Sequence, residues 1–213
     1  MWVVTPAEVE ALFGRRDGQY LFARWGRPIV PIVFGVDDAT LSIFKGAIEA
    51  VVVLAGHKMA EFDSELGANL MVFFCSDWAE LLQVPGLDGL VPELVPLCVR
   101  LAASGANQYR LFRFDEAGAI RAAFVFLCMD GALSTVAAED LALAQAVQII
   151  CLWSDQAFVE TAVLVQISGR VMLRPEIAAV IRAGYDPVLP AVAKDKSHAL
   201  RLLARMVRAD AGS

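Results

Sequence analysis

Histidine is scarce in this chain, and its scarcity excludes a large class of metal-dependent enzymes. The 213 residues include two histidines, His57 and His198, and neither lies in an H-E-x-x-H pattern. A zinc hydrolase needs several nitrogen, sulfur or carboxylate ligands that meet at one ion. The sequence therefore predicts no metal site and no zinc peptidase of that kind. His57 follows a predicted helix end and is expected to be structural, whereas His198 is expected to face solvent on the last helix.

Other catalytic patterns are also missing. The chain has no G-x-S-x-G motif and neither of the glycine-rich loops that bind nucleotides, so no cofactor is expected. Cys75 ends a predicted strand just before a helix, a position that can lower a thiol pKa, but no base lies near it in sequence. A hydrolase-type site based on Cys75 or on carboxylates remains an alternative. The four cysteines are far apart and are predicted to be buried thiols, with one or two disulfides as the alternative.

Long apolar runs and a leader pattern are absent as well. No run reaches the roughly 18 residues needed to span a bilayer, so no transmembrane segment is expected. The first residues show neither a basic n-region nor an apolar h-region. The expected location is cytoplasmic for the sequence as written, and periplasmic if a leader has been removed.

The charge distribution points away from nucleic acid and toward protein contacts. The net charge is −6, whereas nucleic-acid binding favours basic surfaces. Residues 170–213 carry eight basic and four acidic side chains, so this part is basic and the rest is acidic. Arg201, Arg205 and Arg208 form a cationic stripe on the last predicted helix, which could contact the acidic body of this chain or an anionic partner. The hydrophobic fraction of 58% requires a large core or an apolar patch for a partner or for a homodimer.

Hydrophobic periodicity predicts an α+β fold with a mixed sheet of four or five strands and a long buried helix on one face. Thr5 and Glu8 form a capping box for a first short helix, and Asp37 or Asp38 can cap the next one. The predicted strands are 29–35, 68–75, 108–115, 119–129 and a final one near 161–167. A single domain over 1–213 is expected, with a helical lead-in over 1–23 and a helical C-terminal part over 170–213 packed on the core.

The long helix, predicted over 136–158, carries one set of polar side chains. At helical spacing, Gln145, Gln148 and Asp155 fall within one narrow arc of an otherwise apolar surface. This arc is either an ordinary solvent-exposed face or the lining of a cleft. The candidate cleft residues are Gln145, Gln148, Asp155, Trp153 and Trp78.

Four segments of the chain occur in a recognisable order. They are Arg24-Trp25-Gly26-Arg27-Pro28-Ile29, Ala68-Asn69-Leu70-Met71-Val72-Phe73-Phe74, the helix end at Cys151, and Ala183-Gly184-Tyr185-Asp186-Pro187-Val188-Leu189. Together they resemble a proteobacterial family of unknown function, many of whose members are described as secreted proteins or lipoproteins. The predicted core of that family is similar to zincin metallopeptidases. The resemblance covers residues 24–208 and implies the topology of a zincin N-terminal half.

The resemblance also implies that the peptidase chemistry is lost. Cys151 aligns with the family cysteine, but Asp155 stands in the place of a glutamate and Phe158 in the place of a glutamine. The expected function is a non-catalytic, degenerate peptidase-like domain that binds a protein or peptide partner. A hydrolase-type enzyme and a structural homo-oligomer are the two alternatives.

Overall fold

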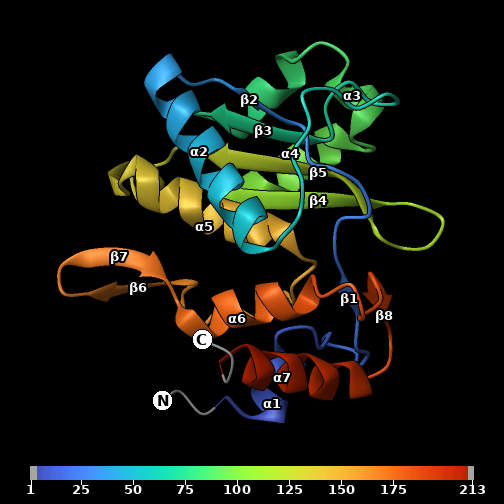
Figure 1. Cartoon of the computed structure of the whole chain (residues 1–213). Helices are drawn as coiled ribbons and strands as arrows, with labels where there is room; N and C mark the ends of the chain where they lie inside the picture. Colours follow the sequence, from blue (N-terminus) through green and yellow to red (C-terminus); the bar gives the residue numbers. More distant parts are fainter. Residues whose placement is uncertain (1–3, 211–213) are drawn as a thin grey trace.

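In the computed structural model, which describes residues 4–210, four strands form one mixed sheet (Figure 1). In spatial order they are β2 (Pro31–Phe34), β3 (Leu70–Cys75), β5 (Ile120–Cys128) and β4 (Gln108–Phe114). β2, β3 and β5 are parallel, and β4 is antiparallel to β5. The predicted α+β class and the mixed four-stranded sheet are therefore confirmed. Pro31 lies on an edge strand, where its missing N–H removes no bond from the interior of the sheet.

Helices cover both faces of this sheet (Figure 1). The elements on one face are α2 (Asp38–Leu54) and α5 (Ala138–Ile150), and those on the other are a 3₁₀ helix (Trp78–Gln83), α3 (Leu87–Leu90) and α4 (Leu94–Ala103). The strands alternate between the two apolar clusters. Leu70 and Val72 of β3 belong to the α2–α5 side, whereas Phe73 and Cys75 belong to the α4 side. This is the period of two that a doubly buried strand must show.

A second group of elements packs below the sheet in Figure 1. Its members are α1 (Pro6–Ala11), β1 (Phe22–Ala23), the hairpin β6 (Leu164–Ile167) and β7 (Arg170–Leu173), α6 (Pro175–Gly184), β8 (Val192–Ala193) and α7 (Ser197–Asp210). β1 pairs antiparallel with β8, which brings the start and the end of the chain together. The larger apolar cluster continues from α2 and α5 into α1, α6 and α7.

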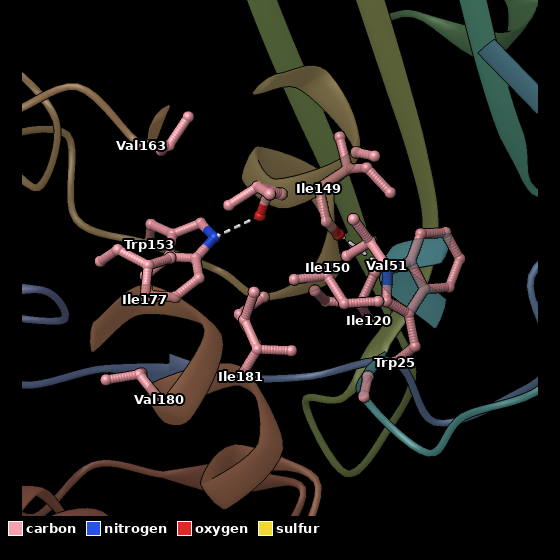
Figure 2. Close-up of a cluster of buried hydrophobic side chains, with 14 of the residues drawn as sticks. Trp25, Val51, Ile120, Ile149, Ile150, Trp153, Val163, Ile177, Val180 and Ile181 are labelled. Carbon is pink, nitrogen blue, oxygen red and sulfur yellow. Dashed lines mark hydrogen bonds between the residues drawn. The ribbon is translucent and has the colours of Figure 1, made fainter. Parts of the chain in front are cut away.

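Two tryptophans anchor this larger cluster through their indole N–H groups (Figure 2). Trp25 donates from Nε1 to the carbonyl oxygen of Ile149 at 2.8 Å, and Trp153 donates to that of Val147 at 2.8 Å. Both carbonyls belong to the last turns of α5, whose final C=O groups have no partner inside the helix. The two indole rings thus pack in the apolar cluster, and their N–H groups also provide hydrogen-bond partners for carbonyl oxygens at the end of α5.

The long helix is shorter than the sequence indicates. It was predicted over 136–158, but α5 ends at Ile150, and Cys151 has extended backbone angles (φ −135°, ψ 162°). Beyond that point tertiary pairing replaces the helical bonds. Cys151 forms an antiparallel bridge with Arg24, and the N–H of Leu152 donates to the carbonyl oxygen of Ala23 at 2.8 Å. Periodicity could not reveal this ending because the residues around it stay apolar.

The C-terminal part is less helical than predicted. It was expected to be helical from residue 170, but Arg170–Leu173 forms β7, and the strand predicted near 161–167 is β6, the other half of the same hairpin. Helical spacing extends back to Ala193, but Ala193 belongs to β8 and the last helix begins at Ser197.

Local helix signals were more reliable than helix lengths. Thr5 and Glu8 form the predicted capping box, and Asp37 caps α2 by accepting from the N–H of Thr40 at 2.8 Å. Asp77 caps the 3₁₀ helix that follows β3, although the sequence also allows a cap at the neighbouring Ser76. Within the described part of the chain, no helix is both long and apolar enough to cross a membrane.

Candidate functional site

The polar arc predicted on the long helix does not form a cleft. Gln145 is buried, Gln148 is half-buried, and Asp155 is exposed in a turn beyond the end of α5. The two tryptophans are also apart, since Trp153 belongs to the larger apolar cluster and Trp78 to the cluster on the other face of the sheet. None of these five residues lines either of the two cavities described below.

Gln145 instead belongs to a hydrogen-bonded group between α5 and the edge strand β4. Nη2 of Arg110 donates to Oε1 of Gln145 at 2.7 Å, and Nε2 of Gln145 donates to Oε1 of Gln108 at 2.8 Å. Burial lowers the pKa of the Arg110 guanidinium to about 10. The two glutamines therefore solvate a buried cation with amide dipoles, which is a structural role.

The cationic stripe of the last helix contacts this same chain at one position. Nη1 of Arg205 lies 3.3 Å from Oδ2 of Asp186, whereas Arg201 and Arg208 are exposed. Asp186 itself belongs to the basic C-terminal part, so this pair does not reach the acidic body of the chain. Lys196, which is not part of the stripe, does reach it, with Nζ at 2.8 Å from Oε1 of Glu10. Contact of the arginine stripe with the acidic body or with an anionic partner stays a prediction.

The four cysteines are buried, and His57 makes a structural hydrogen bond. All four thiols are free and buried, as predicted. Burial raises the pKa of Cys75 to about 12, which removes the activation that its place before a helix suggested. His57 donates from Nε2 to the carbonyl oxygen of Arg27 at 2.8 Å. Among residues 4–210, no group of three or more histidine, cysteine or acidic side chains is placed to hold a metal ion.

His198 is buried, so the predicted solvent exposure is wrong. Its Nδ1 lies 2.9 Å from the hydroxyl of Tyr20, its ring packs on Phe22 with centroids 4.5 Å apart, and its Nε2 is buried without a hydrogen-bond partner. Burial lowers its pKa to about 4, and the nearby charge of Arg201 lowers it further in the same direction. The helix periodicity placed this residue on the polar side because it could not include the aromatic side chains that cover the start of α7.

We expect His198 to make the fold sensitive to mild acid. Its folded-state pKa, about 4, lies below the ordinary value of 6.5, so its contribution to stability is complete above pH 6.5 and is lost as the pH falls to about 4. The free energy of unfolding should drop by about 2–3 kcal/mol over this range. Urea unfolding of the wild type and His198→Gln between pH 7 and 4 measures the drop. His198→Gln should flatten the slope, His57→Gln should keep most of it, and equal slopes in all three proteins would contradict the assignment.

A groove between α1 and α6 is the larger of the two cavities described here. Its volume is about 660 Å³, within the range of ligand and peptide pockets. The third wall is the turn segment 156–162, whose first residues, up to Phe158, were predicted to end the long helix. Apolar side chains dominate the lining; they are Val4, Ala11, Leu12, Ala157, Phe158, Val159, Ala162, Ile177 and Val180.

Packing and hydrogen bonds fix the walls of this groove. Phe13, Trp153 and Phe158 form an aromatic column, with successive ring centroids 5.2 Å apart, that holds the turn segment against the N-terminal region. On the opposite wall, Nε of Arg174 donates to the carbonyl oxygen of Ala162 at 2.8 Å. Phe158, which lines the groove, is thus held from behind by Trp153, and the segment near Ala162 is held by a guanidinium, so the walls are preformed.

The charged lining of the groove is mostly acidic. It comprises Glu8, Glu160, Glu176 and Arg174. Arg174 already contacts Oε1 of Glu176 at 3.3 Å, and Glu8 is engaged in the cap of α1. Oε2 of Glu176 is buried and has no hydrogen-bond partner among residues 4–210. A donor brought by a ligand would satisfy this oxygen, since a buried acceptor without a partner is unfavourable.

Sequence reasoning missed this groove for a definable reason. Phe158 was placed at the end of a predicted helix, and Glu8 was recognised only as part of a capping box. The groove exists because the chain leaves the helix at Cys151 and turns back toward α1, a tertiary event without a local signal. The sequence offers one hint of an apolar surface here, the short run Ala157-Phe158-Val159, which follows the turn-forming residues Ser154 and Asp155. Comparisons with family models, with curated proteins and with solved structures found no match for the chain.

Proposed function

We propose that the protein is a non-catalytic domain, of the degenerate peptidase-like kind that the sequence resemblance implies, and that it binds a segment of a protein or peptide partner. The partner segment would be apolar with a basic residue, and it would bind in the groove between α1 and α6. The observation that carries this function is the unsatisfied Oε2 of Glu176 in a largely apolar, preformed groove. An ammonium or guanidinium group would both satisfy it and offset the acidic lining.

The chemistry of the groove favours binding over catalysis. Its lining residues include no histidine and no cysteine. Glu8 is held by Thr5, and Glu176 shares Arg174, so the carboxylates are engaged in structural contacts rather than paired with a nucleophile. Val159, in contrast, is 69% exposed at the rim, as expected for a side chain that a partner covers.

The binding test uses peptides selected from a phage-displayed random library on the full chain. We expect the enriched peptides to share an apolar core with lysine or arginine beside it. Val159→Asp should weaken the best peptide by about tenfold or more, because it places a charge where an apolar side chain docks. Glu176→Gln should reduce the preference for a basic residue. Titration calorimetry with the synthetic peptide measures both effects.

Val188→Asp is the matched control for this test. Val188 is 71% exposed, much like Val159, but lies in the turn after α6, outside the groove. It should leave the peptide affinity unchanged, and both variants should unfold within about 0.5 kcal/mol of the wild type. Selection of no common sequence, or equal losses in the two aspartate variants, would reject the groove as a binding site.

A further inference from the structure

Two of the four thiols face each other across adjacent strands. Cys75 and Cys128 are register partners and are the last residues of the parallel strands β3 and β5. Register partners point to the same face of a sheet, and both side chains belong to the α4-side cluster. The linear sequence does not show this pairing, because it separates the two cysteines by a helical layer and a hairpin.

Each sulfur reaches toward the other strand. Sγ of Cys75 lies 3.7 Å from the carbonyl oxygen of Leu127, and Sγ of Cys128 lies 3.5 Å from the carbonyl oxygen of Ser76. Each oxygen belongs to the residue next to the opposite cysteine. The two thiols therefore lie between the ends of the two strands, and each faces the other cysteine.

The backbone spacing suits a disulfide bond. Neighbouring strands lie about 4.8 Å apart, and disulfides join Cα atoms separated by about 4.4–6.8 Å. A disulfide requires the two Cβ atoms to move slightly closer together, and the interior of a β-sheet would resist this shift. Here both residues are strand ends, so the adjustment falls on the turns that follow rather than on the interior of the sheet.

The strand ends are also reachable by a small molecule. A cavity of about 500 Å³ opens at this edge of the sheet. Its lining includes Cys75, Ser76 and Met129, the residue after Cys128, whereas Cys128 itself does not line it. Cys75 and Cys128 are slightly more accessible than Cys151, which is fully enclosed in the larger cluster. Cys98 belongs to the same α4-side cluster, but it is on a helix and has no register partner.

We propose that Cys75 and Cys128 form a redox site that is converted to an intramolecular disulfide by small-molecule disulfides. The Cys128 thiol loses its proton to solvent, its sulfur attacks one sulfur of the disulfide RSSR, and RS⁻ leaves and takes up a proton. Deprotonated Cys75 then attacks the Cys128 sulfur, the Cys75–Cys128 bond forms, and the second RS⁻ leaves. Two electrons pass from the protein to RSSR, and two RSH molecules are released.

The order of attack follows from the surroundings of the two sulfurs. Burial is the main cause that raises the pKa of both thiols. The contact between them raises the pKa of Cys75 further and lowers that of Cys128, because the Cys75 thiol stabilises the Cys128 thiolate. Cys128 is therefore the first nucleophile and Cys75 the resolving thiol, and the reaction is expected to speed up as the pH rises.

The test treats the full chain with oxidised glutathione, blocks the remaining thiols and maps the peptides by mass spectrometry. We expect a Cys75–Cys128 linked peptide, loss of the mass of two hydrogen atoms, and reversal by dithiothreitol. The closed loop is long, so the melting temperature should rise by roughly 5 °C or more. Cys98→Ala, a matched change in the same cluster, should leave the bond intact, whereas Cys128→Ala should abolish it.

Three outcomes would overturn this site. They are a bond between Cys75 and Cys98, glutathione adducts that never resolve into an internal bond, and an unchanged mass after prolonged oxidation at high pH. The wild-type peptide map decides among these results even if a variant fails to fold. Peptide binding in the α1–α6 groove is measured separately, so each idea can fail without the other.

Discussion

Replacing Trp25 by alanine should lower the free energy of unfolding by about 3–5 kcal/mol, the range for truncating a large buried aromatic side chain. Small domains are stable by only about 5–15 kcal/mol, so this single change would remove a large part of the total. Urea unfolding followed by circular dichroism measures the loss as a lower midpoint with an unchanged slope.

The size of this effect follows from the place of Trp25 in the structure. Its side chain is 1% exposed and lies among residues of the sheet, α2 and α5 (Figure 2). Its Nε1 satisfies the carbonyl of Ile149, its backbone N–H donates to the hydroxyl of Tyr185 at 3.3 Å, and its backbone bridges to Ile120. Alanine would leave a cavity and an unpaired carbonyl at the end of α5.

Two further variants separate these contributions. Trp25→Phe keeps an aromatic ring but loses the Nε1 bond, so it should cost about 1–3 kcal/mol. Phe62→Ala, at a side chain that is 71% exposed, should change the stability by less than about 0.5 kcal/mol. If Trp25→Ala lowers the free energy of unfolding by no more than Phe62→Ala does, the contacts of Trp25 with the sheet, α2 and α5 do not stabilise the fold.

Asn69→Ala should cost about 3 kcal/mol although it removes little apolar surface. Asn69 has no exposed surface, and its amide connects three segments of the chain. Oδ1 accepts from the N–H of Val30 at 2.8 Å, and Nδ2 donates to the carbonyl of Pro28 at 2.9 Å and to Oδ2 of Asp63 at 3.0 Å. Alanine would leave these groups without this partner, and each unpaired buried polar group costs about 1–3 kcal/mol, although such costs are not strictly additive.

One of the three hydrogen bonds of Asn69 depends on the charge of Asp63, whose carboxylate accepts from Nδ2. Burial tends to raise the pKa of Asp63, but hydrogen bonds from two backbone N–H groups, from Asn69 and from Arg27 outweigh it and lower the pKa to about 2. The carboxylate is therefore ionised at neutral pH and accepts strongly from Nδ2. Asn69→Asp would place a second carboxylate against it, so the stability that this variant loses relative to the wild type at the same pH should be larger at pH 7 than at pH 4.

Asn107→Ala is the matched control for Asn69→Ala. Nδ2 of Asn107 lies 3.3 Å from Oδ2 of Asp130 in an exposed setting, where water can replace the bond. Its loss should cost less than about 1 kcal/mol in the same urea experiment. If both asparagine variants lose similar stability, the Asn69 bonds contribute no more than surface contacts do.

Local chemistry made much of the fold predictable. The capping box at Thr5, the Asp37 cap and the doubly apolar strands β3 and β5 each follow from residues within a few positions of one another. The end of α5 could not be predicted in this way. Its last residues and the extended segment after them are equally apolar, and the segment is held by bonds to Ala23 and Leu12, more than a hundred residues earlier.

The candidate site was harder to predict than the fold, for the same physical reason. The prediction that Gln145, Gln148 and Asp155 share one face required a continuous helix. It is wrong because α5 ends at Ile150, before Asp155. The groove and the Cys75–Cys128 pair both depend on segments that meet only in three dimensions. A side chain such as Gln145 reads as a site residue in sequence, but it solvates the buried Arg110 in the fold.

The pairing of β1 with β8 has a consequence for the order of folding. Phe22 and Ala23 find their strand partners only at Val192 and Ala193, and the neighbouring Arg24 bridges to Cys151. During synthesis from the N-terminus, this early segment therefore stays unpaired until nearly the whole chain has been made. The sheet of β2–β5 has all its strands much sooner, by Cys128. Contacts of such long sequence separation form late, so the β1–β8 ribbon should close last and should join the two ends of an already assembled core.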